Sequence, residues 1–290
     1  MTRSVILVAA VLLAGAAQDR KAPPEGVEFE RDIVYGKGAG EDLRLNLARP
    51  KGAAGPLPCI VVIHGGGWSS GRREQHDDLT WKAAQRGYVS ATVSYRFAPK
   101  HLFPAQVEDV KCAVRFLRAH AEKYGIDPRR IGATGFSAGG HLSLMLGVMG
   151  KEDGLEGEGG WADQSSQVNA VVDFFGPTDF VSAEYPPASR GIVRNFLGGG
   201  RDEKPEEYRK ASPVTYVSKG DAPVLIVQGT KDPLVPHSQA YVMVDALTAA
   251  GVPGRADLIV GAGHGWGGLE LARTLEVTFA FFDQHLRGGK

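Results

Sequence analysis

A serine with a glycine two residues away on each side lies near the middle of the chain. The segment Gly135-Phe-Ser137-Ala-Gly139 matches the pattern G-x-S-x-G, in which the glycines let a strand and a helix approach closely while the serine hydroxyl projects from the bend. The segment falls between a predicted strand and a predicted helix, as such a turn requires. A glycine-rich turn with a capping serine is the alternative. About a quarter of shuffled chains of this composition would contain the pattern by chance, so it does not decide the matter alone.

A histidine followed by three glycines provides a more specific signal. His64-Gly-Gly-Gly67 comes directly after the apolar run of residues 59–63 and precedes Trp68. Such a loop can offer unobstructed backbone N–H groups to the negative oxygen that develops during acyl transfer. A phosphate-binding loop is disfavoured because no P-loop lysine follows and the spacing G-x-G-x-x-G is absent. We expect Trp68 to pack this loop, with the wall of an acyl pocket as its alternative role.

Chain order indicates which histidine is the partner of Ser137. In hydrolases whose serine stands on a G-x-S-x-G turn, the serine comes first along the chain, then the acid, then the histidine. Four of the eight histidines precede Ser137. His141 lies one turn along the same predicted helix and cannot turn back, while His237 begins one predicted helix and His285 ends another. His264 remains, in a glycine-rich loop after a predicted strand, where open α/β sheets place functional groups. We predict that His264 is the general base; capping of the next helix is its alternative role.

The acid of the triad is predicted to be Asp232. It follows the apolar strand at residues 223–227, at the carboxyl end of the strand before that of His264. There it would hold His264 in the tautomer that can accept the serine proton, and it would stabilise the imidazolium that then forms. Asp179 is the alternative, although its surroundings are those of a turn aspartate. Asp257 lies within a predicted strand and is disfavoured.

Strand-like and helix-like segments alternate along the chain. Continuous apolar runs are typical of parallel strands covered on both faces, whereas alternating apolar and polar residues are typical of half-exposed strands. The predicted strands are residues 27–35, 43–48, 59–63, 88–93, 130–134, 168–175, 223–227 and 255–260, and the predicted helices are residues 77–86, 106–123, 137–147, 236–250 and 267–285. The alternation predicts an α/β fold with a mostly parallel sheet, helices on both faces and an antiparallel N-terminal edge.

Length and charge limit the class of protein. The chain has 290 residues, enough for one large α/β domain, which we expect to span residues 27–290. The irregular residues 176–221 are predicted to be a cap or loop insertion within it. Lysine plus arginine and aspartate plus glutamate each number 33. Without a net charge the protein has no overall field to attract nucleic acid or an anionic membrane, so we expect neither as a partner.

The first residues have the pattern of an export signal. Arg3 supplies a positive charge, residues 5–17 form an apolar and small-residue run, and small residues near Ala17 offer a cleavage site. The run is too short to cross a hydrocarbon core of about 30 Å as a helix, so we expect no stable membrane anchor. We predict a signal peptide at residues 1–17, a leader at residues 18–26 and a secreted or periplasmic protein. An uncleaved anchor or a buried helix is the alternative.

The two cysteines, Cys59 and Cys112, fall in a predicted strand and a predicted helix. Two cysteines do not make a disulfide framework, and we expect both to be small core residues. Neither has a histidine in a motif beside it, so neither is a candidate nucleophile. The metal-binding patterns H-E-x-x-H and paired C-x-x-C are absent, so we expect no metal site.

With these residues placed, the sequence resembles the α/β-hydrolases related to hormone-sensitive lipase, in particular the bifunctional or feruloyl esterase-like (BD-FAE) branch. The resemblance runs from about residue 27 to the C-terminus. The motifs that carry it are His64-Gly-Gly-Gly-Trp68, Ser94-Tyr-Arg-Phe-Ala-Pro99, Phe103-Pro-Ala-Gln-Val-Glu-Asp-Val-Lys111, Gly135-Phe-Ser-Ala-Gly-Gly-His-Leu142, Asp173-Phe-Phe-Gly-Pro-Thr-Asp179 and Gly261-Ala-Gly-His264. It implies an α/β-hydrolase fold with a mostly parallel sheet of about eight strands and no cofactor.

The resemblance also implies oxyanion donors, namely the backbone N–H groups of Gly66, Gly67 and Ala138. The sequence departs from lipases with long lids at residues 152–160. This segment is acidic and glycine-rich, whereas a long lipase lid would need apolar residues. No amphipathic lid helix is predicted, which argues against action on fat droplets. Short-chain acyl esters fit better, whether small molecules or acetyl or feruloyl esters of plant polysaccharide, the latter by family analogy and the export signal.

The sequence thus predicts a secreted serine carboxylesterase that works through an acyl-enzyme, with Ser137, Asp232 and His264 as its triad. Two alternatives remain open. The same triad could serve another hydrolase, such as an arylformamidase or an exopeptidase, although prolyl-oligopeptidase-like enzymes usually carry tyrosine where Ala138 stands. A non-catalytic binding protein on a hydrolase scaffold is disfavoured because such proteins typically lose a triad member, and none is lost here.

Overall fold

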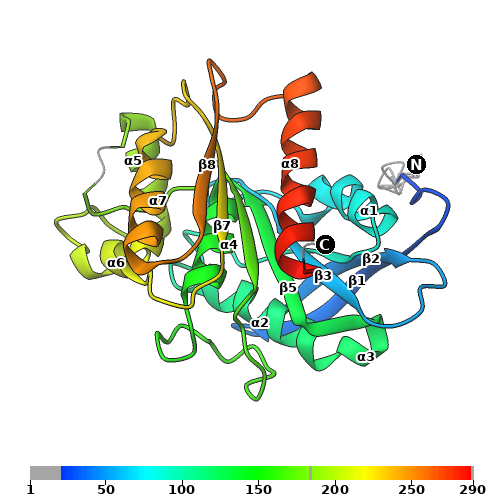
Figure 1. Cartoon of the computed structure of the whole chain (residues 1–290). Helices are drawn as coiled ribbons and strands as arrows, with labels where there is room; N and C mark the ends of the chain where they lie inside the picture. Colours follow the sequence, from blue (N-terminus) through cyan, green and yellow to red (C-terminus); the bar gives the residue numbers. More distant parts are fainter. Residues whose placement is uncertain (1–20, 183–184, 289–290) are drawn as a thin grey trace, which may run out of the picture.

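The computed structural model describes residues 21–182 and 185–288, built around one eight-stranded sheet (Figure 1). The predicted signal peptide and the start of the leader lie outside the described residues. The strands are β1 (Val27–Gly38), β2 (Glu41–Pro50), β3 (Leu57–Ile63), β4 (Val89–Val93), β5 (Ile126–Phe136), β6 (Ala170–Phe174), β7 (Val224–Gly229) and β8 (Gly254–Ile259). Among the helices so described, none has the length and apolar character needed to cross a membrane.

The strands are arranged in the order β1-β2-β4-β3-β5-β6-β7-β8. Strand β1 pairs antiparallel with β2, and β2 pairs antiparallel with β4. All later neighbours pair in parallel. The prediction of a mostly parallel sheet with an antiparallel N-terminal edge is therefore confirmed. Parallel pairing aligns the carboxyl ends of β5, β7 and β8 at one edge of the sheet, which is the edge that carries the functional loops.

Helices cover both faces of the sheet. They are α1 (Asp77–Gln85), α2 (Ala105–Ala119), α3 (Ala121–Tyr124), α4 (Ala138–Val148), α5 (Pro187–Leu197), α6 (Pro205–Lys210), α7 (Ser238–Ala250) and α8 (Gly268–Leu286), with 3₁₀ turns η1 (Arg73–His76) and η2 (Pro213–Thr215). Side chains of α2, α4 and α7 join one core cluster, whereas those of α1 and α8 join the other. Figure 1 shows α8 and α1 on the opposite side of the strands from α7.

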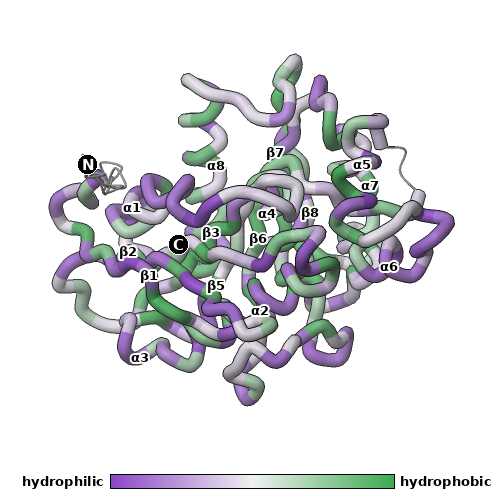
Figure 2. The backbone as a smooth tube through the Cα atoms, turned by 180° about the vertical axis from the view of Figure 1, so that it is seen from behind, coloured by the Kyte–Doolittle hydropathy of each residue, from purple (hydrophilic) through white to green (hydrophobic). Residues whose placement is uncertain are grey.

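Strand β3 shows why the central strands are continuously apolar. Cys59, Val61 and Ile63 belong to the core on one face, and Ile60 and Val62 belong to the core on the other. Successive side chains of a strand point to opposite faces, so a strand covered on both sides buries every residue. Figure 2 shows these central strands largely in green, with purple concentrated in the outer connections.

Both cysteines are buried and unpaired, which confirms that they are small core residues. Several predicted boundaries are wrong, two of them by a whole turn or more. The helix predicted at residues 106–123 is divided: α2 ends at Ala119, and the short α3 follows and is capped by Gly125, which has a φ of 69°. Strand β5 begins at Ile126, four residues before its predicted start, because Ile126 already pairs with Leu57.

The connection between β5 and α4 is unusually tight. Ser137 stands between them with a φ of 55° and a ψ of −117°, a conformation that non-glycine residues rarely adopt. A Cβ atom at Gly135 would lie 2.2 Å from the Gly139 carbonyl oxygen, and one at Gly139 would lie 2.1 Å from the Ile63 carbonyl oxygen. Both glycines are therefore required for the backbones to approach, as the G-x-S-x-G pattern predicts.

A matched pair of glycine substitutions tests this close approach. Gly139→Ala should lower the free energy of unfolding by about 1–3 kcal/mol, because the new methyl group meets backbone that has little room to move. Gly191→Ala, also within a helix but with no atom near the added carbon, should raise it by about 0.5–1 kcal/mol. Urea unfolding of both variants measures the difference. Equal effects at the two positions would contradict the proposed steric requirement.

Candidate active site

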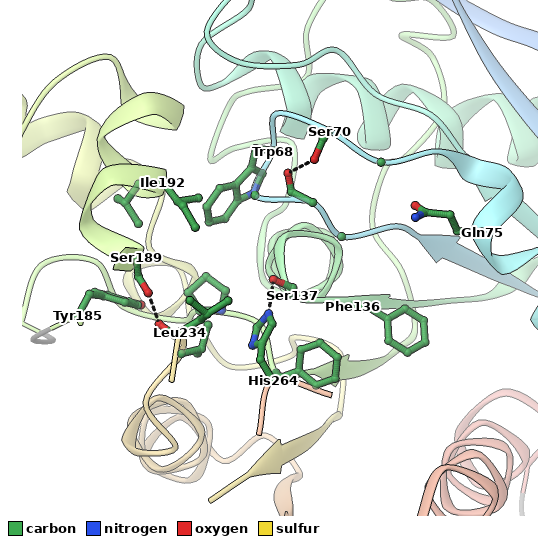
Figure 3. Close-up of a pocket in the computed structure, with 18 of the residues that line it drawn as sticks. Trp68, Ser70, Gln75, Phe136, Ser137, Tyr185, Ser189, Ile192, Leu234 and His264 are labelled. Carbon is green, nitrogen blue, oxygen red and sulfur yellow. Dashed lines mark hydrogen bonds between the residues drawn. The ribbon is translucent and has the colours of Figure 1, made fainter. Parts of the chain in front are cut away.

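The carboxyl ends of three strands bring together Ser137, Asp232 and His264. Ser137 follows β5, Asp232 follows β7 and His264 follows β8. The Ser137 hydroxyl lies 2.8 Å from Nε2 of His264 (Figure 3), and Nδ1 of His264 lies 2.7 Å from Oδ2 of Asp232. In this arrangement the serine donates to the imidazole and the imidazole donates to the carboxylate. A serine so placed can lose its proton to the histidine as it attacks an electrophile.

The Asp232 carboxylate is fully buried and fully hydrogen-bonded. Its Oδ1 accepts from the backbone N–H groups of Leu234 (2.8 Å) and Val235 (2.9 Å), and its Oδ2 accepts from Gln228 Nε2 (3.1 Å) as well as from His264. Burial alone would raise the pKa of Asp232, but the hydrogen bonds from His264 and the two backbone groups outweigh it and hold that pKa below its ordinary value. The acid therefore stays ionised and orients the imidazole.

The glycine loop after β3 lies beside the serine. Gly66 and Gly67 line the same cavity as Ser137 and His264, and Ala138 is the first residue of α4, where N–H groups have no partner within the helix. Among the described residues, none accepts a hydrogen bond from the backbone N–H of Gly66, Gly67 or Ala138. Gly66 has a φ of +114°, so the loop conformation itself requires glycine. These three N–H groups are available to a ligand oxygen.

Trp68 ties this loop to the helix that follows the serine. Its indole N–H donates to Nδ1 of His141 (3.2 Å), and Nε2 of His141 lies 2.7 Å from the Ala211 carbonyl oxygen, to which it donates. The Trp68 ring, only 3% exposed, also stacks on Phe196 with centroids 4.2 Å apart. The predicted packing role is confirmed, and Trp68 lines the cavity as well. Burial lowers the pKa of His141 to about 4, so its ring is neutral and can accept from Trp68.

The cavity around Ser137 has a volume of about 450 Å³. One wall comes from the segment at residues 176–221, which contains α5 and α6. Figure 3 shows Tyr185, Ser189 and Ile192 from this segment facing the serine, with Leu234 below them. The sequence did not identify these wall residues, because nothing in their spacing distinguishes a cavity wall from a loop. Both ring nitrogens of His141 are engaged, by Trp68 and by the Ala211 carbonyl oxygen, and the link to Trp68 was missed for the same reason.

The alternative acids lie elsewhere. Asp179 accepts the backbone N–H of Val181 at 2.8 Å and so closes a local turn, as its sequence context predicted. Asp257 pairs with Arg273 at 2.8 Å on the surface. Within residues 21–182 and 185–288, no group of three or more histidine, cysteine, aspartate or glutamate side chains is placed to hold a metal ion.

Comparison with known proteins agrees with this architecture. The BD-FAE family model matches residues 45–247. Esterase LipC of Mycobacterium tuberculosis is 34% identical over 224 residues, which are 76% of this chain and 55% of LipC. The chain spans about half the length of the curated relatives it matches, which include the M. tuberculosis esterase LipQ at 31% identity.

Solved structures are similar over almost the whole chain. A truncated carbohydrate esterase from gut microbiota matches with a TM-score of 0.77 and 27% identity, over 90% of this chain and 99% of that one. Esterase Est2 of Thermogutta terrifontis, with propionate bound, matches with a TM-score of 0.75 and 30% identity, over 90% of this chain and 96% of Est2. The fold and the site define an α/β-hydrolase. The chain belongs to the BD-FAE family of that fold.

The buried His141 leads to a prediction about pH. In the unfolded chain it binds a proton near its ordinary pKa of 6.5, whereas in the folded protein it does so only near 4. The unfolded state therefore gains protons first, and the free energy of unfolding should fall by about 2 kcal/mol between pH 7 and pH 5 from this group. His141→Gln, which cannot become charged, should lose correspondingly less. Urea unfolding at the two pH values measures this, and an equal loss in both proteins would contradict it.

Proposed function

We propose that the protein is a serine carboxylesterase. The observation that carries the proposal is the hydrogen-bonded chain from Ser137 through His264 to the buried Asp232, beside a loop with free backbone N–H groups. If Ser137 were only part of a turn, another turn residue could stand in its place, and the strained backbone conformation of a serine there would have no purpose. The curated relatives are esterases by name, which supports the same chemistry here.

The geometry supports an acyl-transfer mechanism in two halves. His264 takes the Ser137 proton as Oγ attacks the ester carbonyl carbon, and the resulting oxyanion accepts hydrogen bonds from the N–H groups of Gly66, Gly67 and Ala138. Asp232 stabilises the imidazolium. As the tetrahedral intermediate collapses, the ester bond breaks and the alcohol leaves with the proton from His264. Water then attacks the acyl-enzyme by the same steps, which releases the acid and restores the serine.

The cavity favours short acyl groups. Trp68, Tyr185, Ile192 and Leu234 form an apolar wall close to the serine within about 450 Å³, and Figure 3 shows them grouped on one side of Ser137. Est2 has been solved with propionate and with butyrate bound, which supports acyl groups of that size.

We further propose that the natural alcohol is a carbohydrate, as in acetylated or feruloylated plant polysaccharide. Two similar structures support this proposal. One is the gut-microbiota carbohydrate esterase, and the other is a bifunctional GH43-CE protein of Bacteroides eggerthii, which is 27% identical with a TM-score of 0.78. The export signal expected at residues 1–17 would bring the enzyme to such a substrate outside the cytoplasm. N-terminal sequencing of the mature protein tests that export proposal.

Paired substitutions test the triad. Ser137→Ala and Asp232→Asn should each lower kcat on p-nitrophenyl acetate by about 10³–10⁴-fold, because the first removes the nucleophile and the second leaves the imidazole in the wrong tautomer. Asp179→Asn, the same chemical change at the alternative acid, should stay within about threefold of the wild type. Full activity of Ser137→Ala would disprove the serine mechanism, and loss of activity only in Asp179→Asn would assign the acid to that residue instead.

A further inference from the structure

A second cavity of about 350 Å³ adjoins the one that holds the serine. The two share a wall, since Gln75, His76, Phe136 and Phe175 line both of them. The acyl-transfer mechanism uses none of the residues that belong to the second cavity alone. Gly265, the residue after His264, also lines the second cavity, so a space of this size beside the triad can hold a part of the substrate.

The walls of this second cavity are mostly aromatic. The His76 ring stacks on Phe136 with centroids 4.4 Å apart, and Phe136 stacks in turn on Phe174 at 4.7 Å. Trp266 packs edge-on against Phe175 at 5.4 Å, and its indole N–H is held by the Thr274 hydroxyl at 3.0 Å. These contacts fix the rings in place, so the walls of the cavity are firmly held aromatic groups and not mobile side chains.

Polar side chains border the same cavity. Gln75, Asp78 and Lys82 line it and are exposed to solvent. Asp78 pairs with Lys21 at 3.0 Å, whereas Lys82 makes no ion pair or side-chain hydrogen bond with any residue in the described part of the chain. The cavity thus combines apolar walls with hydrogen-bonding groups at its margin.

The position of His264 decides which part of an ester enters this cavity. His264 must pass its proton to the departing alcohol oxygen, so the alcohol leaves on the side of the imidazole. The ring of Phe175 contacts that imidazole with centroids 4.7 Å apart and also lines the second cavity. Figure 3 shows Phe136 and Gln75 on the opposite side of Ser137 from Trp68 and Ile192. The alcohol therefore lies toward the shared wall of Phe136 and Phe175, and the acyl group lies toward Trp68 and Ile192.

We propose that the second cavity binds the alcohol part of the ester and that its occupant is a sugar ring. A pyranose has apolar C–H groups, which match the aromatic walls, and hydroxyl groups around its edge, which match Gln75 and Lys82 at the margin. An acyl chain has no polar edge to satisfy these groups. The inference rests on the proposed carbohydrate esterase function and names the residues that would recognise the sugar.

A blocking substitution and its matched control test this assignment. Leu271 in α8 lines the second cavity, while Leu269, two residues earlier in the same helix and 89% exposed, does not. The substrates are ethyl acetate, phenyl acetate and a mono-acetylated methyl xylopyranoside, which share one acyl group and differ in the alcohol. Leu271→Trp should lower the ratio of kcat/KM for the acetylated sugar to kcat/KM for ethyl acetate by about tenfold or more, whereas Leu269→Trp should preserve it.

A third variant separates a sugar from an aromatic alcohol. Lys82→Ala removes a hydrogen-bonding group without filling the cavity, so it should lower kcat/KM for the acetylated sugar more than for phenyl acetate. Thermal unfolding midpoints of all three variants check that each is folded.

Each result has one meaning. If the wild type hydrolyses ethyl acetate but no acetylated sugar, the carbohydrate function itself is wrong, and the sugar occupant with it. If the wild type hydrolyses the sugar ester and both tryptophan variants keep the same ratio, the function stands and the cavity assignment is overturned. If Leu271→Trp affects phenyl acetate alone, or Lys82→Ala affects both ring esters equally, the occupant is not a sugar.

Discussion

Strand β3 and helix α4 touch through their backbones, and the geometry of the site depends on that contact. The carbonyl oxygen of Ile63 occupies the space that a side chain at Gly139 would need, and the Phe136 carbonyl oxygen lies 2.7 Å from where a Cβ atom of Gly65 would be. Because the glycine loop begins directly after β3, this contact places its N–H groups beside Ser137. The nucleophile and the proposed oxyanion donors are therefore positioned by the main chain, which moves less than side chains do.

Two hydrogen-bonded chains hold the remaining parts around this contact. One runs from Ser137 through His264 to Asp232, whose carboxylate is anchored by backbone N–H groups of its own loop. The other runs from Trp68 through His141 to the segment that forms the cavity wall. Each depends on a buried group with all its partners present, and an unpaired buried polar atom would cost about 1–3 kcal/mol. The site is preorganised before any substrate binds.

The features that depend on strand ends and chain order could be predicted from the sequence. Ser137, Asp232 and His264 each lie at or within a few residues of the end of a strand, and parallel strands bring such residues to one edge, so their meeting could be anticipated. The cavity walls could not, because Tyr185 and Ile192 lie in an irregular segment whose position depends on tertiary packing. His76 was likewise unrecognised, since its stacking on Phe136 joins residues sixty positions apart. Local pattern carries no information about such contacts.

Ser137 is the proposed nucleophile on which the mechanism depends, and covalent trapping tests this role most directly. Est2 has been solved after phosphorylation by paraoxon, so the same reagent is suitable here. After treatment with paraoxon, intact-mass and peptide mass spectrometry should find one diethylphosphoryl group per chain, attached to Ser137, with esterase activity lost in proportion. Modification of another residue with loss of activity, or full activity in a protein phosphorylated at Ser137, would contradict this role for Ser137.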